Sequence, residues 1–164
     1  MKRKVLLLLL LVIPLVAKEQ EKGPNLLQVL QQGGEFNTLI AAFQEAELVP
    51  LLSELGPYTL FAPTDRAFTL LFPGTLQELM VPEGRLKLRT LLRYHLVRGE
   101  LTPDQIRRAG VLNTLAGEPL VVNPSWGQIE IENATLGEAM KGTNGVVYPI
   151  DRVLQPTEGA SYGG

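Results

Sequence analysis

The 164-residue chain contains no cysteine and only one histidine, His95. Without cysteine no disulfide can form, and one histidine cannot supply the several Cys or His ligands that a structural zinc site needs. A single domain of about this length buries roughly 68–70% of the surface of its unfolded chain. We therefore expect one domain that is stabilised by its packed core alone and holds no metal.

The sequence also lacks the signatures of common catalytic and cofactor sites. It contains no glycine-rich phosphate loop, no calcium-binding loop and no Gly-x-Ser-x-Gly nucleophile motif. A Ser–His–Asp triad would need His95, whose apolar neighbours Leu92 and Leu96 indicate a buried imidazole instead. These absences predict that the protein is not an enzyme and carries no cofactor.

Positive charge is scarce once the first residues are set aside. The chain has 15 Lys and Arg against 17 Asp and Glu. Residues 1–17 contain Lys2, Arg3 and Lys4 and no acid, so the remainder has 12 cations against 17 acids. Binding to nucleic acid rewards clustered cations. The acidic balance therefore argues against a nucleic-acid partner.

The N-terminus has the three-part pattern of a secretory signal peptide. A basic start at Met1 to Lys4 precedes an apolar run from Val5 to Val16, the small residue Ala17 and a polar stretch. The apolar run is shorter than the ~20 residues that span a bilayer as a helix. We expect cleavage after Ala17 and a secreted protein, extracellular or in the periplasm and cell envelope. The alternative is an uncleaved N-terminal anchor, which would be the only attachment to a membrane.

Short helices are expected in the first part of the mature chain. Residues 18–24 read as a polar leader, Asn25 as a helix N-cap, and Gly33 with Gly34 as the end of that helix. A second helix is expected next, because four apolar residues recur at the i, i+3, i+4, i+7 spacing of one helical face, namely Phe36, Leu39, Ile40 and Phe43. A third short helix is expected over residues 50–55.

A strand and further helices follow. Residues 58–62 are rich in β-forming side chains. Thr64 or Asp65 is expected to cap a helical turn, and Thr75 with Glu78 has the capping-box signature of another helix. Further elements are expected as a helix over 83–93, a strand over 94–97 and a helix over 103–109 that begins at Thr102-Pro103.

The last third has the pattern of a β structure. Residues 128–132 alternate polar and apolar side chains, so one side of this strand should face a core. Residues 157–164 are rich in Gly and are expected to form a disordered tail. Helices followed by strands indicate an α+β fold with a predominantly antiparallel sheet. The expected strands cover residues 111–115, 120–123, 128–132 and 146–154.

Several segments together resemble the fasciclin (FAS1) domain family. Thr59 to Phe68 resembles its first signature box and Asn144 to Leu154 its second, with Tyr94-His95 between them where the family has a Tyr-His motif. Asn113 to Gly117 also matches a typical stretch, and the likeness extends over residues 25–156. The resemblance implies a FAS1 wedge-shaped β-sandwich with several short helices packed in its N-terminal half.

The residues of these motifs also have structural interpretations. Thr64 and Asp65 redirect the chain from a strand into a helix, and Asn144-Gly145 forms a turn before the last strand, which contains Asp151. We interpret His95 as a buried imidazole that must find a hydrogen-bond partner. The candidate partners are Thr64 and Asp65.

The resemblance implies a role in binding rather than a reaction. What FAS1 domains share is a role as non-enzymatic modules for cell adhesion and contact with the extracellular matrix, and the resemblance implies this role here. In animal members, contacts attributed to integrins involve the Tyr-His motif, which Tyr94-His95 matches, and an Asp-Ile pair. This chain instead reads Gly-Glu-Ala-Met over residues 137–140, which argues against integrin-type binding. Pro149 also departs from the family, because proline in a strand predicts an edge or a bulge.

Two functions remain open. The first is a monomeric adhesion module that binds a cell-surface or matrix protein or glycan, with Tyr94, His95 and Trp126 as candidate binding residues. The second is a carrier of an apolar small molecule such as a carotenoid or lipid, in a groove lined by Phe36, Phe43 or Phe72. Arg85, Arg89 and Arg93 recur at every fourth residue, which indicates a solvated helix face or, as the alternative, an anion-binding stripe.

Overall fold

The computed structural model describes residues 23–125 and 127–157. The predicted signal peptide, the first residues of the polar leader (18–22), Trp126 and nearly all of the predicted tail (158–164) lie outside the described residues. The expectations for those segments therefore stay predictions. Among the described residues, no helix is both long and apolar enough to cross a membrane.

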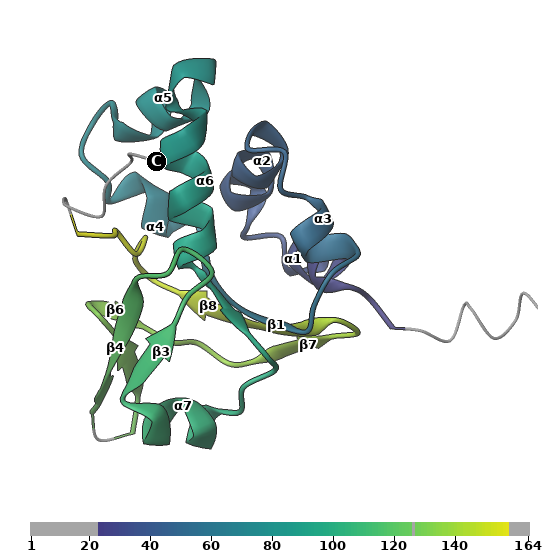
Figure 1. Cartoon of the computed structure of the whole chain (residues 1–164), viewed down its shortest axis with the longest axis vertical. Helices are drawn as coiled ribbons and strands as arrows, with labels where there is room; N and C mark the ends of the chain where they lie inside the picture. The colour runs from purple at the N-terminus through teal and green to yellow at the C-terminus, as the bar shows by residue number, and fades with distance from the viewer. Residues whose placement is uncertain (1–22, 126, 158–164) are drawn as a thin grey trace, which may run out of the picture.

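Helices dominate the first half of the chain and strands the second half (Figure 1). The first half contains α1 (Leu26–Gly33), α2 (Asn37–Glu45), α3 (Pro50–Ser53), β1 (Tyr58–Pro63), α4 (Asp65–Thr69), α5 (Thr75–Met80), the 3-10 helix η2 (Pro82–Gly84) and α6 (Arg85–Tyr94). The second half contains β2 (Leu96–Arg98), α7 (Pro103–Ala109), β3 (Val111–Asn113), β4 (Pro119–Pro124), β5 (Ile129–Ile131), β6 (Ala134–Thr135), β7 (Met140–Gly142) and β8 (Gly145–Ile150).

The strands form two four-stranded sheets. The first has the order β2-β1-β8-β7, and the second has the order β3-β4-β5-β6. β1 and β8 run parallel, with Tyr58 opposite Gly145 and Pro63 opposite Ile150. The other strand pairs described are antiparallel, which confirms the expected α+β fold with a predominantly antiparallel arrangement. Single bridges between Val97 and Thr114 and between Leu136 and Ile150 connect the two sheets.

The first sheet lies between two cores, and the alternation of side chains along β8 shows how. Val147 packs with the helices, whereas Val146 and Tyr148 pack with the second sheet. In the neighbouring β1, Leu60 faces the helices and Phe61 faces the second sheet. A strand that is buried on both faces needs a continuous apolar run instead of an alternating pattern. This requirement agrees with the burial of consecutive residues along β1 and β8, where all six residues of β1 and five of the six of β8 are buried.

The first helices form where the sequence predicts them. Asn25 Oδ1 accepts the N–H of Gln28 at 2.9 Å, and Gln28 Oε1 accepts the N–H of Asn25 at 3.0 Å, which makes a complete capping box. Gly34 ends α1 in the left-handed conformation with a φ of 72°. The predicted apolar face of α2 is confirmed, because Leu39 and Phe43 are fully buried.

Two local expectations were wrong, and two short strands were not predicted. Thr75 does not cap α5, because Gly74 occupies the N-cap position and no side chain bonds there. Residues 94–97 are not one strand: Tyr94 ends α6, His95 is its C-cap, and β2 starts at Leu96. The buried leucine face of α6 keeps the chain helical through Tyr94, since the N–H of His95 still bonds the carbonyl of Leu92. The sequence pattern also missed β6 and β7, whose two and three residues are too short for a periodic signal.

Pro149 lies in a central strand, and its position explains why the sheet tolerates it. β8 is flanked by β1 and β7. However, β7 begins at Met140, which pairs with Val147, so β7 does not extend as far as Pro149. The carbonyl of Pro149 accepts the N–H of Gly137 at 2.7 Å, so its backbone points away from β1. The missing N–H of proline therefore falls where β7 no longer pairs. The expected edge is present locally, although β8 as a whole is not an edge strand.

The arginine row of α6 is used inside the molecule. Arg89 Nε donates to the carbonyl of Ala46 at the end of α2 (2.8 Å), and Arg89 also pairs with Glu47 at 3.1 Å. Arg85 reaches Glu45 and Glu47 at 3.6 and 3.7 Å. A cation at the C-terminal end of a helix is favourable because of the helix dipole. Two of the three arginines therefore join α6 to α2, which departs from both the solvated face and the anion-binding stripe.

Candidate functional site

Thr64 and Asp65 lie where β1 turns into α4, and both act as caps. Thr64 Oγ1 accepts the N–H of Ala67 at 3.3 Å and so caps α4 itself. Asp65 caps a different helix, because its Oδ1 accepts the N–H of Thr38 in the first turn of α2 at 2.7 Å. Burial opposes ionisation of this carboxyl, but the hydrogen bonds from Thr38 and Asn37 outweigh it and hold the pKa of Asp65 below its usual value.

His95 is buried, as expected, but its partners are neither Thr64 nor Asp65. Its Nε2 accepts the N–H of Leu154 at 2.9 Å, and its Nδ1 lies 2.7 Å from the carbonyl of Leu91. Because a backbone N–H can only donate, Nε2 must be unprotonated and Nδ1 must carry the proton. The ring therefore ties α6 to the segment after β8. Thr64 and Asp65 are not available, since they are engaged by α4 and α2.

Burial fixes the protonation states of both residues of the Tyr-His motif. Complete burial lowers the pKa of His95 to about 4, with the Leu91 carbonyl opposing the shift. The ring of Tyr94 meets His95 edge to face, with the centroids 6.4 Å apart. Burial, together with the negative charges of Glu132 and Glu118, raises the pKa of Tyr94 to about 12. Both side chains are therefore neutral at physiological pH and are withdrawn from solvent.

The residues of the second box also hold segments together. Asn144 Oδ1 accepts the N–H of Leu26, and its Nδ2 donates to the carbonyls of Leu52 and Leu55 at 2.9 and 2.7 Å. This one side chain joins α1 and α3 to the turn before β8. Asp151 Oδ1 accepts the N–H of Thr135 at 2.8 Å, which fixes β6 against the end of β8. The side chains of Asn144 and Asp151 thus bond to different segments and do not meet in one site.

Gly145 is fixed by a close backbone approach. Its φ is 152°, and a Cβ added there would lie 1.9 Å from the carbonyl oxygen of Tyr58. Only glycine allows β1 and β8 to pair at this point. The predicted structural residues Thr64, Asp65, Asn144, Gly145 and Asp151 thus occupy separate joints of the fold and do not form one site.

A groove next to the Tyr-His motif is the best candidate for binding. It has a volume of about 510 Å³ and lies between the connection from α4 to α5, the turn from β5 to β6 and the segment after β8. Leu70 and Phe72 on its rim are 60% and 83% exposed. Polar lining comes from Glu132, Asn133 and Arg152. The site therefore combines exposed apolar side chains with charged and amide groups.

His95 supports one wall of this groove from behind. The wall includes Val153 and Gln155, which flank the Leu154 N–H that His95 holds. Val153 turns its side chain into the helical core, and Leu154 is buried in the sandwich core. The Tyr-His motif thus acts through the backbone that shapes the groove and does not face a ligand itself.

The expectation of an apolar groove lined by three phenylalanines is wrong for two of them. Phe36 and Phe43 are buried in the helical core and do not line the groove, because the amphipathic spacing of α2 turns them inward. Phe72 does line it. Leu70 and Arg152 also line the groove and are not among the binding residues predicted from the sequence. The signal that was available is the apolar run Leu70-Leu71-Phe72, which a Pro-Gly pair ends in a turn where burial is difficult.

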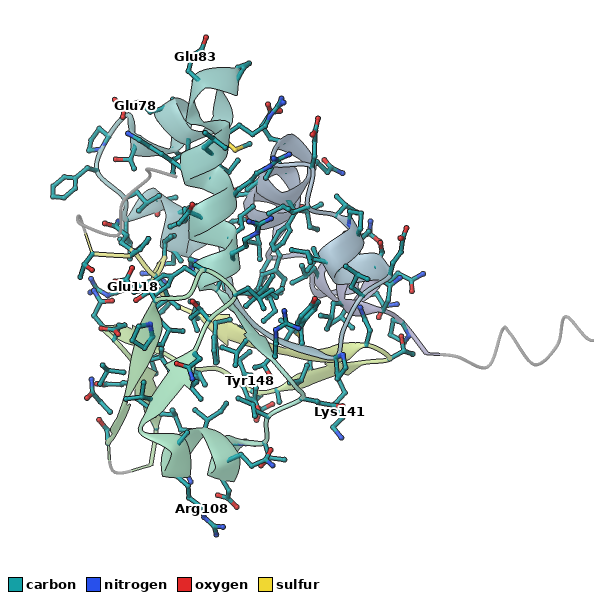
Figure 2. The ribbon with its side chains drawn as sticks, in the orientation of Figure 1. Glu78, Glu83, Arg108, Glu118, Lys141 and Tyr148 are labelled. Carbon is teal, nitrogen blue, oxygen red and sulfur yellow. The ribbon has the colours of Figure 1, made fainter. Side chains whose placement is uncertain are left out.

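The remaining candidate positions lie elsewhere. Trp126 lies outside the described residues, while its neighbour Gly127 lines another cavity of about 460 Å³ together with Glu138 and Arg107. Residues 137–139, part of the stretch where the family pair Asp-Ile is missing, are exposed. Within the described chain, no three His, Asp or Glu side chains gather as metal ligands would. Figure 2 shows the carboxylates of Glu78, Glu83 and Glu118 spread over different elements.

The comparison with known proteins decides the family. The fasciclin domain model matches residues 34–156, most of the chain. The chain belongs to the fasciclin family. Its FAS1 domain is 39% identical over 137 residues to the protein sll1483 of Synechocystis, covering 83% of this chain and 76% of that protein. It is 34% identical over 128 residues to the immunogenic protein MPB70 of Mycobacterium bovis, covering 74% of this chain and 64% of that protein.

Longer proteins contain similar FAS1 domains. The chain is 36% identical to the transforming growth factor-beta-induced protein ig-h3 of the rabbit Oryctolagus cuniculus, covering 80% of this chain but 19% of that protein. A solved FAS1 domain pair from the insect cell adhesion molecule fasciclin I shares the fold, with a TM-score of 0.71 and 16% identity. The alignment covers 85% of this chain and 53% of the insect chain. The fold therefore agrees with the wedge-shaped sandwich that the resemblance implied.

Proposed function

We propose that the protein is an exported, non-enzymatic FAS1 module that binds a protein or glycan of the cell surface or extracellular matrix. The observation that carries the proposal is the pair Leu70 and Phe72, held in solvent on the rim of a groove with charged lining. Exposed aromatic side chains on a fixed backbone are common centres of binding energy. The adhesion role of fasciclin I, whose fold this chain shares, supports the same class of function.

A pull-down from the native cell envelope tests this proposal. We expect the wild-type protein to retain a surface component that Phe72→Ser loses, because loss of the ring removes the exposed anchor. Leu86→Ser is the matched control, since Leu86 is 70% exposed on α6 and does not line the groove. Trp126→Ala tests the second predicted binding residue in the same assay. Equal retention by wild type and Phe72→Ser would remove the groove from the proposal.

Export has its own test. We propose that residues 1–17 are removed as a signal peptide, on the basis of the basic start, the apolar run and Ala17. N-terminal sequencing of the protein isolated from its native host should then begin at Lys18. A chain that begins at Met1 and sediments with membranes would show an uncleaved anchor instead.

Carriage of an apolar small molecule is the second candidate. The groove volume of about 510 Å³ falls within the range of small-molecule sites, and Phe72 provides one aromatic wall. The charged lining and the burial of Phe36 and Phe43 make this candidate the weaker one. A carotenoid carrier purified from its host should absorb visible light because of a bound pigment, and organic solvent should extract that pigment. An adhesion module should be colourless.

A further inference from the structure

The turn between β7 and β8 contains the one Asn-Gly pair of the sequence, Asn144-Gly145. Asparagine is a chemically labile residue, because the backbone nitrogen of the next residue can attack its side-chain amide. Glycine offers the least obstructed nitrogen for this attack, since it has no side chain. Every other asparagine of the chain precedes a residue with a side chain. The sequence therefore places its most reactive amide in this turn.

The reaction is a spontaneous deamidation that needs only water. The nitrogen of Gly145 loses its proton and bonds to Cγ of Asn144, while the bond from Cγ to Nδ2 breaks and ammonia leaves. The product is a cyclic succinimide. Water then opens the ring at either carbonyl, which gives aspartate or isoaspartate, the form in which the main chain passes through Cγ. In sum, one water is consumed and one ammonia is released.

The fold holds the amide that would react. Asn144 Oδ1 accepts the N–H of Leu26 at 2.9 Å, and Nδ2 donates to the carbonyls of Leu52 and Leu55 at 2.9 and 2.7 Å. Figure 1 shows the β7–β8 turn at the end of the first sheet, beside α1 and α3, which supply or adjoin these backbone groups. Ring closure requires Cγ and the nitrogen to reach bonding geometry, so it must break these hydrogen bonds.

The fold also holds the nitrogen that would attack. The carbonyl of Asn144 accepts the N–H of Tyr58 at 3.0 Å. Because the peptide unit is planar, this bond fixes the nitrogen of Gly145 as well. On the other side of Asn144, the N–H of Thr143 donates to the carbonyl of Pro24 at 2.9 Å. Both reacting groups are thus held by segments from the start of the described chain and from β1.

We propose that Asn144-Gly145 is a deamidation site that the native fold protects and that unfolding exposes. In the folded protein the reaction has to wait for a local opening of the turn. In an unfolded chain none of the protecting bonds exists, so the pair reacts as it would in a free peptide. Deamidation is irreversible, and its extent therefore records the time that a chain has spent unfolded.

The products do not fit the joint that Asn144 forms. An aspartate at this position has an oxygen in place of Nδ2, which faces the carbonyls of Leu52 and Leu55 and cannot donate to them when ionised. An isoaspartate lengthens the main chain just before Gly145, where the backbone lies against the carbonyl of Tyr58. Either product weakens the connection of α1 and α3 to β8, so a modified chain should refold poorly.

Peptide mapping tests the protection. The full chain is kept at mildly alkaline pH either in guanidinium chloride or in sodium chloride of equal molarity, and circular dichroism verifies the unfolded and folded states. Trypsin releases residues 142–152, whose only amide side chain is that of Asn144, so mass spectrometry follows the change of NH₂ to OH directly. We expect modification at least about tenfold faster in guanidinium chloride, because the folded chain reacts only from its opened fraction.

The same digests contain an internal control. Residues 109–141 form one tryptic peptide with Asn113, Asn123 and Asn133, none of which precedes glycine. These asparagines should react slowly in both solutions. The partly modified sample is then diluted out of guanidinium chloride, and the refolded fraction is separated by size-exclusion chromatography. Deamidated 142–152 should be depleted from the refolded fraction.

A matched pair of variants tests the effect of the product itself. Asn144→Asp should lower the midpoint of urea denaturation, because it removes both donations from Nδ2. Asn133→Asp is the control, since Asn133 is exposed and its side chain has no hydrogen bond within the described chain. This variant should keep the wild-type midpoint.

Three results would overturn the proposal. The first is an equal rate of deamidation at Asn144 in the folded and unfolded samples. The second is a refolded fraction that contains modified chains in the same proportion as the whole sample. The third is an Asn144→Asp midpoint equal to that of Asn133→Asp. Because no ligand takes part in these measurements, none of the results affects the proposal for the groove beside Phe72.

Discussion

At the scale of single residues, His95 shows how a signature residue can matter without touching a ligand. It is completely buried, accepts from Leu154 and donates to Leu91. A second proton would place an N–H against the N–H of Leu154 and bury an uncompensated charge. The neutral ring is therefore part of the folded structure, and acid should act on stability through it.

We predict that His95 makes the stability of the protein fall between pH 6.5 and about 4. The unfolded imidazole takes up a proton near pH 6.5 and the folded one near pH 4, so its full contribution is present above pH 6.5 and decreases as the pH falls. The slope approaches about 1.4 kcal/mol per pH unit. Urea denaturation at several pH values, wild type against His95→Gln, measures it. Equal slopes for both proteins in this window would contradict the prediction.

His95→Ala gives a simpler test at neutral pH. It leaves the Leu154 N–H and the Leu91 carbonyl without their partner in a buried place, at a cost of about 1–3 kcal/mol for each unsatisfied group. We therefore expect a clear decrease in the melting temperature, which differential scanning calorimetry would measure. An unchanged melting curve would show that the ring is not structurally important.

Gly145 supports a sharper residue-scale prediction. Gly145→Ala should cost several kcal/mol, because its Cβ would collide with the Tyr58 carbonyl in the central pair β1–β8. Gly99→Ala is the matched control: Gly99 has a φ of 92°, but an added Cβ would have nothing within 4 Å. The control should lose about 1–2 kcal/mol from the left-handed conformation alone. Equal losses in urea denaturation would show that the close approach is unimportant.

At the scale of elements, the helices are joined by side chains from neighbouring elements. α2 has no side-chain cap of its own, and Asp65 from the start of α4 supplies it. The end of α2 is bonded in turn by Arg89 from α6. Both ends of this nine-residue helix therefore depend on other helices, which explains how so short a helix remains ordered.

Removal of the Asp65 carboxylate should destabilise α2. We expect Asp65→Ala to lower the free energy of unfolding by about 0.5–2 kcal/mol, the range for loss of an N-cap. The contribution is present above the ordinary carboxyl pKa of 3.8 and is lost as the pH falls through the lower folded pKa. Asp104→Ala is the control, since Asp104 is 75% exposed and Thr102 caps α7. An equal loss for both variants in urea denaturation would exclude the capping role.

The same elements show what the sequence could and could not predict. The N-caps at Asn25 and Thr102 and the apolar face of α2 are local signals, and all three are confirmed. The partners of Asp65 and His95 come from distant segments, so no local pattern contained them. The parallel pairing of β1 with β8 has the same origin. The groove was missed in large part because exposure of Leu70 and Phe72 depends on what packs around them.

At the scale of the whole molecule, the first sheet makes the two cores one unit. β1 and β8 contribute side chains to both cores, so neither core can open without exposing the other. We expect a single unfolding transition. Leu39→Ala in the helical core and Ile131→Ala in the sandwich core should each lower stability by about 2–5 kcal/mol.

Two optical signals test this cooperativity. Far-UV circular dichroism reports mainly on the helices, and the fluorescence of Trp126, the only tryptophan, reports from the sequence between β4 and β5. In wild type and in both core variants, the midpoints of the two signals in urea should coincide. Separate midpoints in either variant would show that the cores unfold independently.

The position of β8 has a consequence for how the chain is made. This strand comes from residues 145–150, near the end of the sequence, yet it is inserted between β1 and β7 in the middle of the first sheet. A growing chain cannot close either core until these residues have been synthesised, because β1 has no parallel neighbour before then. Folding of both cores therefore waits for residues 145–150.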